Sequence, residues 1–443
     1  MSADTIYALS SAPGKAGVAI VRVSGAGALI SFQKITGAKP EARVATVYPL
    51  QDKKGALIDR ALVIAFQGPN SFTGEDVVEY HIHGSQAVLE ALFETLSAFD
   101  GHRMATGGEF TKRAFENGKM DLTAAEAIAD LIDAQTQAQR QQALNQMNGA
   151  LANLYEGWRT ELVTIMAYIE AVIDFPDEDV PDSKIQTQIP ALQKLIREIS
   201  EHLNDRHRGE RLRDGIQIAI LGAPNAGKSS LLNALTKRDV AIVSPMAGTT
   251  RDVIEAHLNI NGYPVTLADT AGLRAEELKD DGGHGSIESE GIKRALKCAD
   301  SADIKLLLFD GTEEPNKNTL SLKDENSIIV VTKKDMKGFV SQKDAIAISS
   351  TTGEGIDTLI KMLSEKISKA YSDSRETPSL TRSRHRDALE ETHQRLNHSL
   401  TAKLPELMAE DIRMAAKGLG RITGRVDVED LLDVIFRDFC IGK

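Results

Sequence analysis

The spacing of hydrophobic and polar positions divides this chain of 443 residues into three kinds of segment. In the first 120 residues, short apolar runs such as 18–21 and 61–66 lie between glycine turns, which predicts a separate α+β domain. From about residue 211 to 370, apolar runs of strand length such as 216–221 alternate with helical and loop segments. This alternation predicts a mostly parallel sheet with helices on both faces.

The segments on either side of this central region have the longer apolar spacing of helices. Residues 123–126 (TAAE) fit a capping box and predict the start of an alanine- and glutamine-rich helix that continues to about residue 147. Further helices are expected at residues 152–173, 189–203, 384–402, 407–417 and 428–436.

Two polar stretches, 206–211 and 372–378, indicate linkers around the central region. The predicted fold is therefore a multidomain α/β chain in which the central domain is inserted into an all-α domain whose two halves pack together. The predicted domains are 1–120 (α+β), 121–210 (first helical half), 211–370 (inserted domain) and 371–443 (second helical half).

The most informative motif is GAPNAGKS at residues 222–229, which fits the phosphate-loop pattern G-x-x-x-x-G-K-S. It follows the strand-like run 216–221 and precedes a helical run, 231–235. A strand, a glycine-rich loop and a helix start direct backbone N–H groups and the positive end of the helix dipole at an anion. The motif predicts a nucleotide site with Lys228 as its mobile charge.

Three later motifs follow in the order of a GTPase domain. GTTRD at 248–252 offers a threonine for Mg²⁺, and DTAG at 269–272 offers an aspartate for the Mg²⁺ shell and the N–H of Gly272 for a γ-phosphate. TKKD at 332–335 stands where N-K-x-D is expected, so Thr332 replaces an asparagine and alters one base contact. Asp335 still favours guanine over adenine, and 347–350 occupies the place of the last guanine-side loop.

Leu273 stands where Ras-type GTPases carry the glutamine that orients water. A leucine cannot polarise water, so the domain either hydrolyses GTP slowly or obtains a base elsewhere. The polar, glycine-rich stretch 274–290 resembles a mobile switch and contains several candidate carboxylates.

Composition narrows the class of protein. The net charge of −12 argues against indiscriminate nucleic-acid binding but leaves room for a local basic face. Two cysteines, Cys298 and Cys440, imply no disulfide framework, and neither a membrane span nor a signal pattern is evident. We expect a cytoplasmic protein without a membrane partner.

The four blocks together resemble the MnmE (TrmE) family of tRNA modification GTPases. The likeness covers nearly the whole chain and includes TIYA at 5–8, VRVSG at 21–25, the runs 69–74 and 76–84, GGEFT at 107–111, FENGKMDL at 115–122 and FCIGK at 439–443. The resemblance implies a homodimer that assembles with MnmG (GidA), an FAD- and NADH-using protein, in a heterotetramer acting on tRNA. It implies addition of an aminomethyl or carboxymethylaminomethyl group at C5 of the wobble uridine, with a 5,10-methylene or 5-formyl tetrahydrofolate derivative as carbon donor.

The resemblance also implies roles for individual residues. Folate binding falls on Arg22, Glu79, Lys119 and Lys443; Mg²⁺ on Ser229 and Thr250; and K⁺ on Asn225, Ser244, Met246 and Thr249. Glu288, before the pair at 291–292, takes the place of the family's catalytic glutamate, and Cys440 is a second candidate catalytic residue. The expected GTP site comprises Asn225, Ala226, Gly227, Lys228, Ser229, Ser230, Ser244, Thr249, Thr250, Asp269, Thr270, Ala271, Gly272, Lys333, Asp335 and Ser349.

Two other functions fit part of the pattern. A ribosome-assembly GTPase would append an RNA module such as a KH domain, but GRITG at 420–424 has one residue too many for a GXXG loop. A membrane-remodelling GTPase would need a lipid-binding signal that is not evident. A cluster of Arg413, Lys417, Arg421 and Arg425 suggests a tRNA-facing patch, and His81 with His83 is a weak metal pair without a third ligand.

Overall fold

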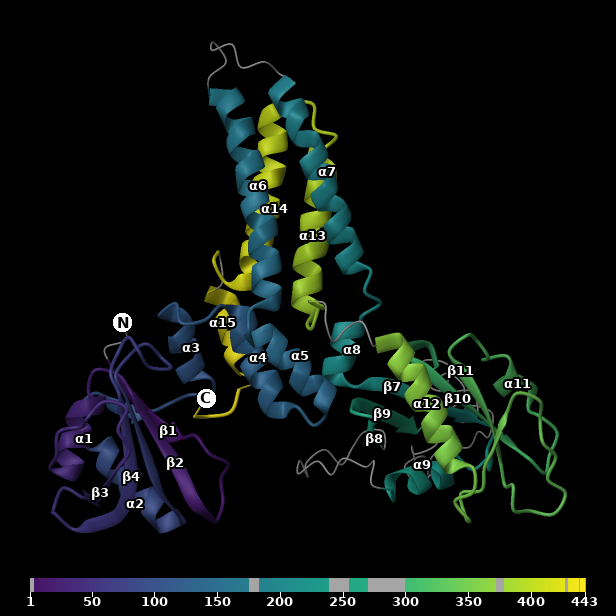
Figure 1. Ribbon diagram of the computed structural model, residues 1–443, viewed down its shortest axis with the longest axis horizontal. Helices are drawn as coiled ribbons and strands as arrows, with labels where there is room; N and C mark the ends of the chain where they lie inside the picture. Colours follow the sequence, from purple (N-terminus) through teal and green to yellow (C-terminus); the bar gives the residue numbers. More distant parts are fainter. Residues whose placement is uncertain are drawn as a thin grey trace, which may run out of the picture. The chain divides into compact units, whose positions relative to one another are not determined.

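The computed structural model describes residues 4–174, 183–238, 255–269, 299–371, 378–426, 429–437 and 439–442. The chain folds as two compact units (Figure 1). Unit 1 combines residues 1–129, 147–181 and 402–443, and unit 2 combines residues 130–146 and 182–401. The helices expected to form one domain are therefore divided between the two units, and the predicted domain limits stay a prediction.

A six-stranded sheet forms the first part of unit 1, with strand order β3-β4-β5-β2-β1-β6. Its strands are β1 (Thr5–Leu9), β2 (Ala16–Ser24), β3 (Thr46–Gln51), β4 (Leu57–Phe66), β5 (Val77–Gly84) and β6 (His102–Met104). Helices α1 (Ala28–Thr36) and α2 (Gln86–Ser97) bury their apolar residues, among them Phe32 and Leu92, against one face of the sheet. The α+β prediction for this region is confirmed.

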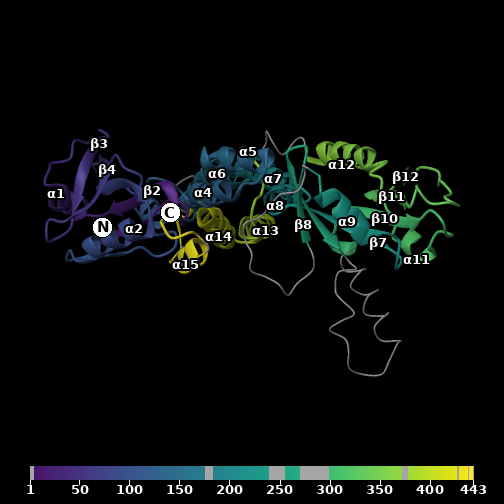
Figure 2. The same cartoon turned by 90° about the horizontal axis from the view of Figure 1, so that it is seen from below.

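The helical part of unit 1 contains a long pair, α6 and α14, which lie side by side (Figure 1 and Figure 2). The helices of this part are α3 (Glu109–Glu116), α4 (Leu122–Asp133, whose last turn belongs to unit 2), α6 (Ala150–Asp174), α14 (Pro405–Thr423) and α15 (Glu429–Arg437). Buried Tyr155 and Trp158 of α6 face this interior.

The single helix expected from residue 123 to 147 is wrong in two respects. The chain forms two helices, α4 and α5 (Gln137–Met147), separated at residues 134–136. The capping side chain is Asp121, whose carboxylate accepts from the Ala124 N–H at 3.0 Å and from the Thr123 hydroxyl. Thr136 makes a second start, because its hydroxyl accepts from the Gln139 N–H. Short polar side chains therefore begin a helix at both places.

The sheet of unit 2 has the order β12-β11-β10-β7-β9-β8, and every pairing is parallel except that of β8 with β9. Its strands are β7 (Ile216–Gly222), β8 (Glu255–Ile260), β9 (Tyr263–Asp269), β10 (Ile304–Asp310), β11 (Ser327–Thr332) and β12 (Ile346–Ala347). Ile218 and Ile220 belong to an apolar cluster that includes residues of α9 (Lys228–Thr236) and α12 (Ile356–Tyr371). Ala219 and Leu221 belong to a second cluster with Ala299. Burial on both faces confirms the predicted parallel sheet.

The rest of unit 2 is helical and includes the junction that precedes β7. Its elements are α5, α7 (Ser183–Leu203), α8 (Arg208–Asp214), α11 (Lys317–Leu320) and α13 (Ser383–Ser399). Arg386 of α13 donates to the Leu203 carbonyl at 2.9 Å, to Asp205 at 2.7 Å and to Glu210 of α8 at 3.2 Å. A Cβ at Gly209 would lie 2.1 Å from the Leu380 carbonyl oxygen, so the chain enters the nucleotide-site region and leaves it at one place.

The fold class predicted from the sequence is confirmed, including a mostly parallel sheet covered by helices. Within the described residues, no helix is long and apolar enough to cross a membrane.

Candidate functional site

The phosphate-binding loop of unit 2, residues 222–229, joins the end of β7 to the start of α9. A Cβ at Gly222 would lie 2.7 Å from the carbonyl oxygen of Leu308 on β10, so glycine permits this close approach. Gly227, the residue before α9, has a φ of 89°, which glycine adopts readily. The first N–H groups of a helix have no partner inside it, so the start of α9 offers donors to an anion.

A cavity of about 640 Å³ lies over this loop, within the range of roughly 300–1,000 Å³ typical of small-molecule sites. On the loop side it is lined by Pro224, Asn225, Gly227, Lys228, Ser229 and Ser230. Its other lining residues are Thr332, Lys333, Asp335, Met336, Ser350 and Thr351. The two motifs that the sequence assigned to phosphate and base thus line one cavity.

Lys228 is only 9% exposed, and its ammonium donates to two carbonyls of its own loop. These are the Gly222 oxygen at 2.8 Å and the Ala223 oxygen at 2.9 Å. A buried ammonium requires such acceptors, and a phosphate would offer it stronger, charged ones. The side chain is therefore held at the loop in a position from which it can turn to an anion.

The base side of the cavity is built at the carboxyl ends of β10 and β11. Asp310 and Thr332 are paired in register, and Lys333, with a left-handed φ of 61°, forms an ion pair with Asp310. Burial opposes ionisation of Asp310, but the interactions with Lys333 and the two bonds from Thr312 together outweigh it and lower the pKa of that carboxyl. Asp335 is exposed at the cavity, where its carboxylate can accept from a ligand.

A second polar site lies on the sheet of unit 1. Arg22 of β2 and Glu79 of β5 are cross-strand neighbours, joined by an Nη2–Oε1 contact of 2.8 Å, and each side chain is about one-fifth exposed. The Arg22 guanidinium lies 5.3 Å from the centre of the Phe72 ring and 5.7 Å from that of Phe110. His81 adds an imidazole 3.9 Å from Glu79. The ion pair and the exposed Phe72 ring suit a flat, polar heterocycle, whereas the fully buried Phe110 ring only supports the guanidinium.

Lys119 belongs to the same region through the loop that carries Phe72. Its ammonium donates to the Pro69 carbonyl at 2.7 Å. The side-chain amide of Asn117 donates to the Thr73 carbonyl at 2.7 Å. Two contacts thus fasten the 69–74 loop to the end of α3, and the loop brings Lys119 into the neighbourhood of Arg22.

The 439–442 segment is docked onto the same unit mainly by its backbone. Gly442 accepts from the Ser10 hydroxyl at 2.9 Å, Ile441 forms an isolated antiparallel bridge with Gly107, and the Cys440 carbonyl accepts from the Gly108 N–H. The register of β1 places Leu9 opposite Val21, beside Arg22. Gly442, the residue before Lys443, therefore lies near the strand position of the Arg22–Glu79 pair.

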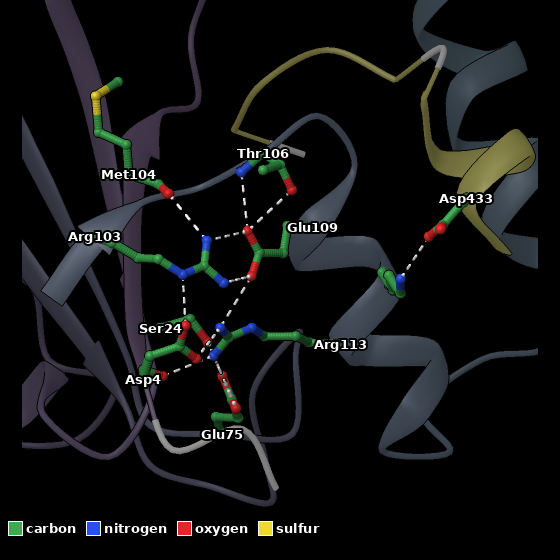
Figure 3. Close-up of polar contacts among 10 residues, drawn as sticks. Asp4, Ser24, Glu75, Arg103, Met104, Thr106, Glu109, Arg113 and Asp433 are labelled. Carbon is green, nitrogen blue, oxygen red and sulfur yellow. Dashed lines mark hydrogen bonds and ion pairs between the residues drawn. The ribbon is translucent and has the colours of Figure 1, made fainter. Parts of the chain in front are cut away.

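A network of five charged side chains supports the helix start that receives this segment (Figure 3). Figure 3 shows the guanidinium groups of Arg103 and Arg113 directed at the Glu109 carboxylate. Arg113 also donates to Asp4 at 2.9 Å and to Glu75 at 3.2 Å. Burial opposes ionisation of Glu109, yet the bonds it receives, led by those from Arg103, lower its pKa to about 2. Sequence patterns gave no signal for this network.

Comparison with known proteins identifies the family of the chain. A family model described as the MnmE helical domain matches residues 122–440, and one described as the GTP-binding protein TrmE N-terminus matches residues 5–119. The chain belongs to the MnmE family. The proteins named tRNA modification GTPase MnmE from Paramagnetospirillum magneticum and Parvibaculum lavamentivorans are 50% and 51% identical to it over 448 and 446 residues. Each alignment covers 99% of this chain and 100% of the relative.

Most of the described residues that were expected to bind GTP line the cavity, whereas two of them, Ala226 and Ser349, are buried and do not line it. Asn225, Gly227, Lys228, Ser229, Ser230, Lys333 and Asp335 line the cavity. Ala226 belongs to the loop but is only 2% exposed. Ser349 is fully buried, and its hydroxyl accepts from the Thr352 N–H, while its neighbours Ser350 and Thr351 line the cavity. Met336, 53% exposed at the base side, was missed because a methionine carries no motif signal.

The remaining expected residues lie outside the described part of the chain. These are Ser244, Met246, Thr249, Thr250, Thr270, Ala271, Gly272, Glu288 and Lys443, together with the side chain of Asp269, whose backbone ends β9. Their roles stay predictions.

The basic cluster of α14 is partly neutralised by α6. Arg413 contacts Glu170 at 2.6 Å, and Arg425 contacts Glu156 at 2.6 Å. Lys417 and Arg421 lie exposed one turn apart on α14. Residues 420–423 are helical, as expected, which disfavours the KH-loop alternative. Among the described residues no group of three or more metal-ligating side chains is present, and His83 bonds Asp59.

Proposed function

We propose that this chain is a GTP-hydrolysing enzyme that modifies tRNA at C5 of the wobble uridine, together with an FAD-dependent partner. The observation that carries the proposal is the cavity over the phosphate loop, in a chain whose relatives along its full length are named tRNA modification GTPases. Such a cavity, lined by both the phosphate-loop residues and Asp335, suits a guanine nucleotide.

The nucleotide site supports this proposal through the chemistry of its side chains. Lys228 and the N–H groups at the start of α9 would bind the phosphates, and Asp335 would accept from the N1–H and N2–H₂ groups of guanine. Mg²⁺ would be held by Ser229 and Thr250, and K⁺ by Asn225, Ser244, Thr249 and the carbonyl of Met246. Hydroxyl and amide oxygens are suitable ligands for these hard cations, and exposed Asn225 fits this role. The cations would neutralise charge on the phosphates, and Glu288 would act on water in place of Leu273.

The Arg22–Glu79 site supports binding of a tetrahydrofolate derivative. Reduced pterin carries amide and amine groups that can donate to Glu79, and the exposed ring of Phe72 gives the site a flat apolar wall. Lys119 and Lys443 would bind folate carboxylates. The folate would supply a one-carbon unit, and Cys440, exposed in its docked segment, is the candidate nucleophile.

The proposed working form is a cytoplasmic homodimer in a heterotetramer with MnmG, which would carry FAD and NADH. The decisive experiment is mass spectrometry of wobble nucleosides in tRNA from cells that lack this protein. Loss of the C5 modification, restored by the wild-type gene, is expected; unchanged modification would refute the proposal and favour another RNA-associated switch GTPase.

A second measurement tests the proposed cation. GTP hydrolysis is compared in K⁺ and Na⁺ at equal ionic strength, with Asn225→Ala as the variant. We expect faster hydrolysis in K⁺ for the wild type and little difference for the variant. Equal wild-type rates would refute cation-driven hydrolysis while leaving the tRNA assay unaffected.

A further inference from the structure

Thr332, the residue that departs from the N-K-x-D pattern, is turned toward the phosphate loop. It ends β11 and is 1% exposed. Its hydroxyl donates to the Ala226 carbonyl at 2.9 Å, and the Phe309 carbonyl lies 3.2 Å away as a second acceptor. Both oxygens belong to the backbone of neighbouring elements, so this single side chain joins β11 to the loop and to β10.

Packing reinforces this bond. A Cβ added to Gly227 would lie 3.5 Å from the Cβ, the methyl carbon and the hydroxyl oxygen of Thr332. The side chain therefore lies directly against the glycine from which α9 starts. The loop that would hold phosphate and the strand end that would hold the base are in van der Waals contact at this one residue.

The chemistry of a hydroxyl limits what Thr332 can do for the base. A threonine has one proton to donate, whereas an asparagine amide has two. Guanine offers two acceptors, N7 and O6, on its major-groove edge. Because the proton of Thr332 is used by backbone carbonyls, it cannot also be given to such an acceptor. Selection between guanine and adenine then falls on Asp335, which meets donors on guanine and a lone pair at N1 of adenine.

We propose that Thr332 is a positioning residue that braces the phosphate loop and takes no part in selecting the base. The inference rests on the proposed guanine-nucleotide site. Loss of the brace leaves the buried Ala226 carbonyl without its partner and loosens the loop where phosphate binds. The loss should therefore weaken binding of the phosphate groups, whichever base the nucleotide carries.

The test compares Thr332→Val, which keeps the shape and removes the hydroxyl, with Thr332→Ser, which keeps the hydroxyl. Two probes are titrated with Mg²⁺ present: GDP by calorimetry, and inorganic pyrophosphate, which has no base, by phosphorus NMR. Thr332→Val is expected to weaken both probes by the same factor, about fivefold or more, and Thr332→Ser to stay within about twofold of wild type.

Weaker GDP binding with unchanged pyrophosphate binding would show a base contact and overturn the inference, as would no change for either probe. The proposed function is tested separately by the wild-type protein: GDP must bind more tightly than ADP. Hydrogen exchange of the peptide 222–229 without nucleotide gives an independent readout, and faster exchange is expected in Thr332→Val only.

Discussion

Gly442→Ala tests whether the docked 439–442 segment belongs to the site around Arg22. Gly442 has a φ of 98°, and a Cβ there would lie 2.1 Å from the Leu9 carbonyl oxygen and 2.8 Å from its carbon. The obstacle is backbone of β1, which cannot rotate away as a side-chain end could. The variant must therefore release its last residues from β1.

The expected size of the effect follows from the contacts that hold the segment. The Ser10 bond, the Gly108 bond and the Gly107–Ile441 bridge contribute about 1 kcal/mol each after exchange with water. The entropy of ordering the backbone opposes these contacts, so the docked state is favoured by no more than about 3 kcal/mol. Left-handed strain of about 1–2 kcal/mol, together with the clash, removes this margin. The free energy of unfolding of unit 1 should fall by no more than the free energy of docking, because the segment can detach while the rest of the unit stays folded.

The assay is hydrogen exchange of the peptides around Ser10 and Gly108, followed by titration with 5-formyltetrahydrofolate. Both peptides should exchange faster in Gly442→Ala, and folate affinity should fall at least about tenfold as contacts to the segment are lost. Gly37→Ala is the matched control, because Gly37 has a φ of 68° but nothing within 4 Å of its added Cβ.

Unchanged exchange in Gly442→Ala would refute the reasoning about docking. Faster exchange with unchanged folate affinity would support the docking of the segment but show that the segment does not contribute to folate binding.

Three further predictions follow from the described contacts. Lys228→Ala should weaken GDP binding at least about 30-fold, measured by calorimetry, because a buried cation that would pair with phosphate is lost. The control Lys237→Ala, at an exposed position, should leave GDP binding unchanged. Equal effects of the two variants would contradict the assignment of Lys228 to the phosphate site. Glu109→Gln should lower the free energy of unfolding of unit 1 by up to about 3 kcal/mol, because folding lowers the pKa of Glu109 from 4.5 to about 2. The full loss is expected above about pH 4.5, and the difference from wild type should shrink as the pH falls toward 2. Urea unfolding at pH 6 and 3.5, followed by hydrogen exchange of residues 102–116, measures this, and a pH-independent difference would argue against it. Lys417→Glu with Arg421→Glu should weaken tRNA binding and reduce its salt slope by about 0.7–0.9 per lost phosphate contact; an unchanged slope would exclude the α14 patch.

Elements with a strong local signal were predictable from the sequence. The continuous apolar run before the phosphate loop became β7, and the run 328–331 became the centre of β11, because strands buried on both faces show little polar alternation. The phosphate loop was predictable for a related reason: Gly222 and Lys228 are fixed by local geometry and by anion chemistry. The break at residues 134–136 was missed because alanine and glutamine favour a helix on either side of it.

Contacts between residues distant in sequence were not predictable. The threonine at 332 looked like a weakened base contact, and only its position under Gly227 shows the bond to Ala226. Arg103, Glu109 and Arg113 carry no motif, and their network also requires Asp4 and Glu75 from other elements. Such partners depend on strand order and register, which one sequence does not specify.

The approach of Gly209 to Leu380 has a consequence for the order in which unit 2 folds. Closing a loop of about 170 residues costs about 4–5 kcal/mol in chain entropy, and α7 and α13 can pair only after that cost has been met. The contacts within the parallel sheet compensate for this entropy cost when the sheet forms, and they bring the chain segments on either side of the sheet together. The folded sheet therefore holds its two flanking segments together, and the pairing of α7 with α13 is expected to form late, after the nucleotide-site region has folded.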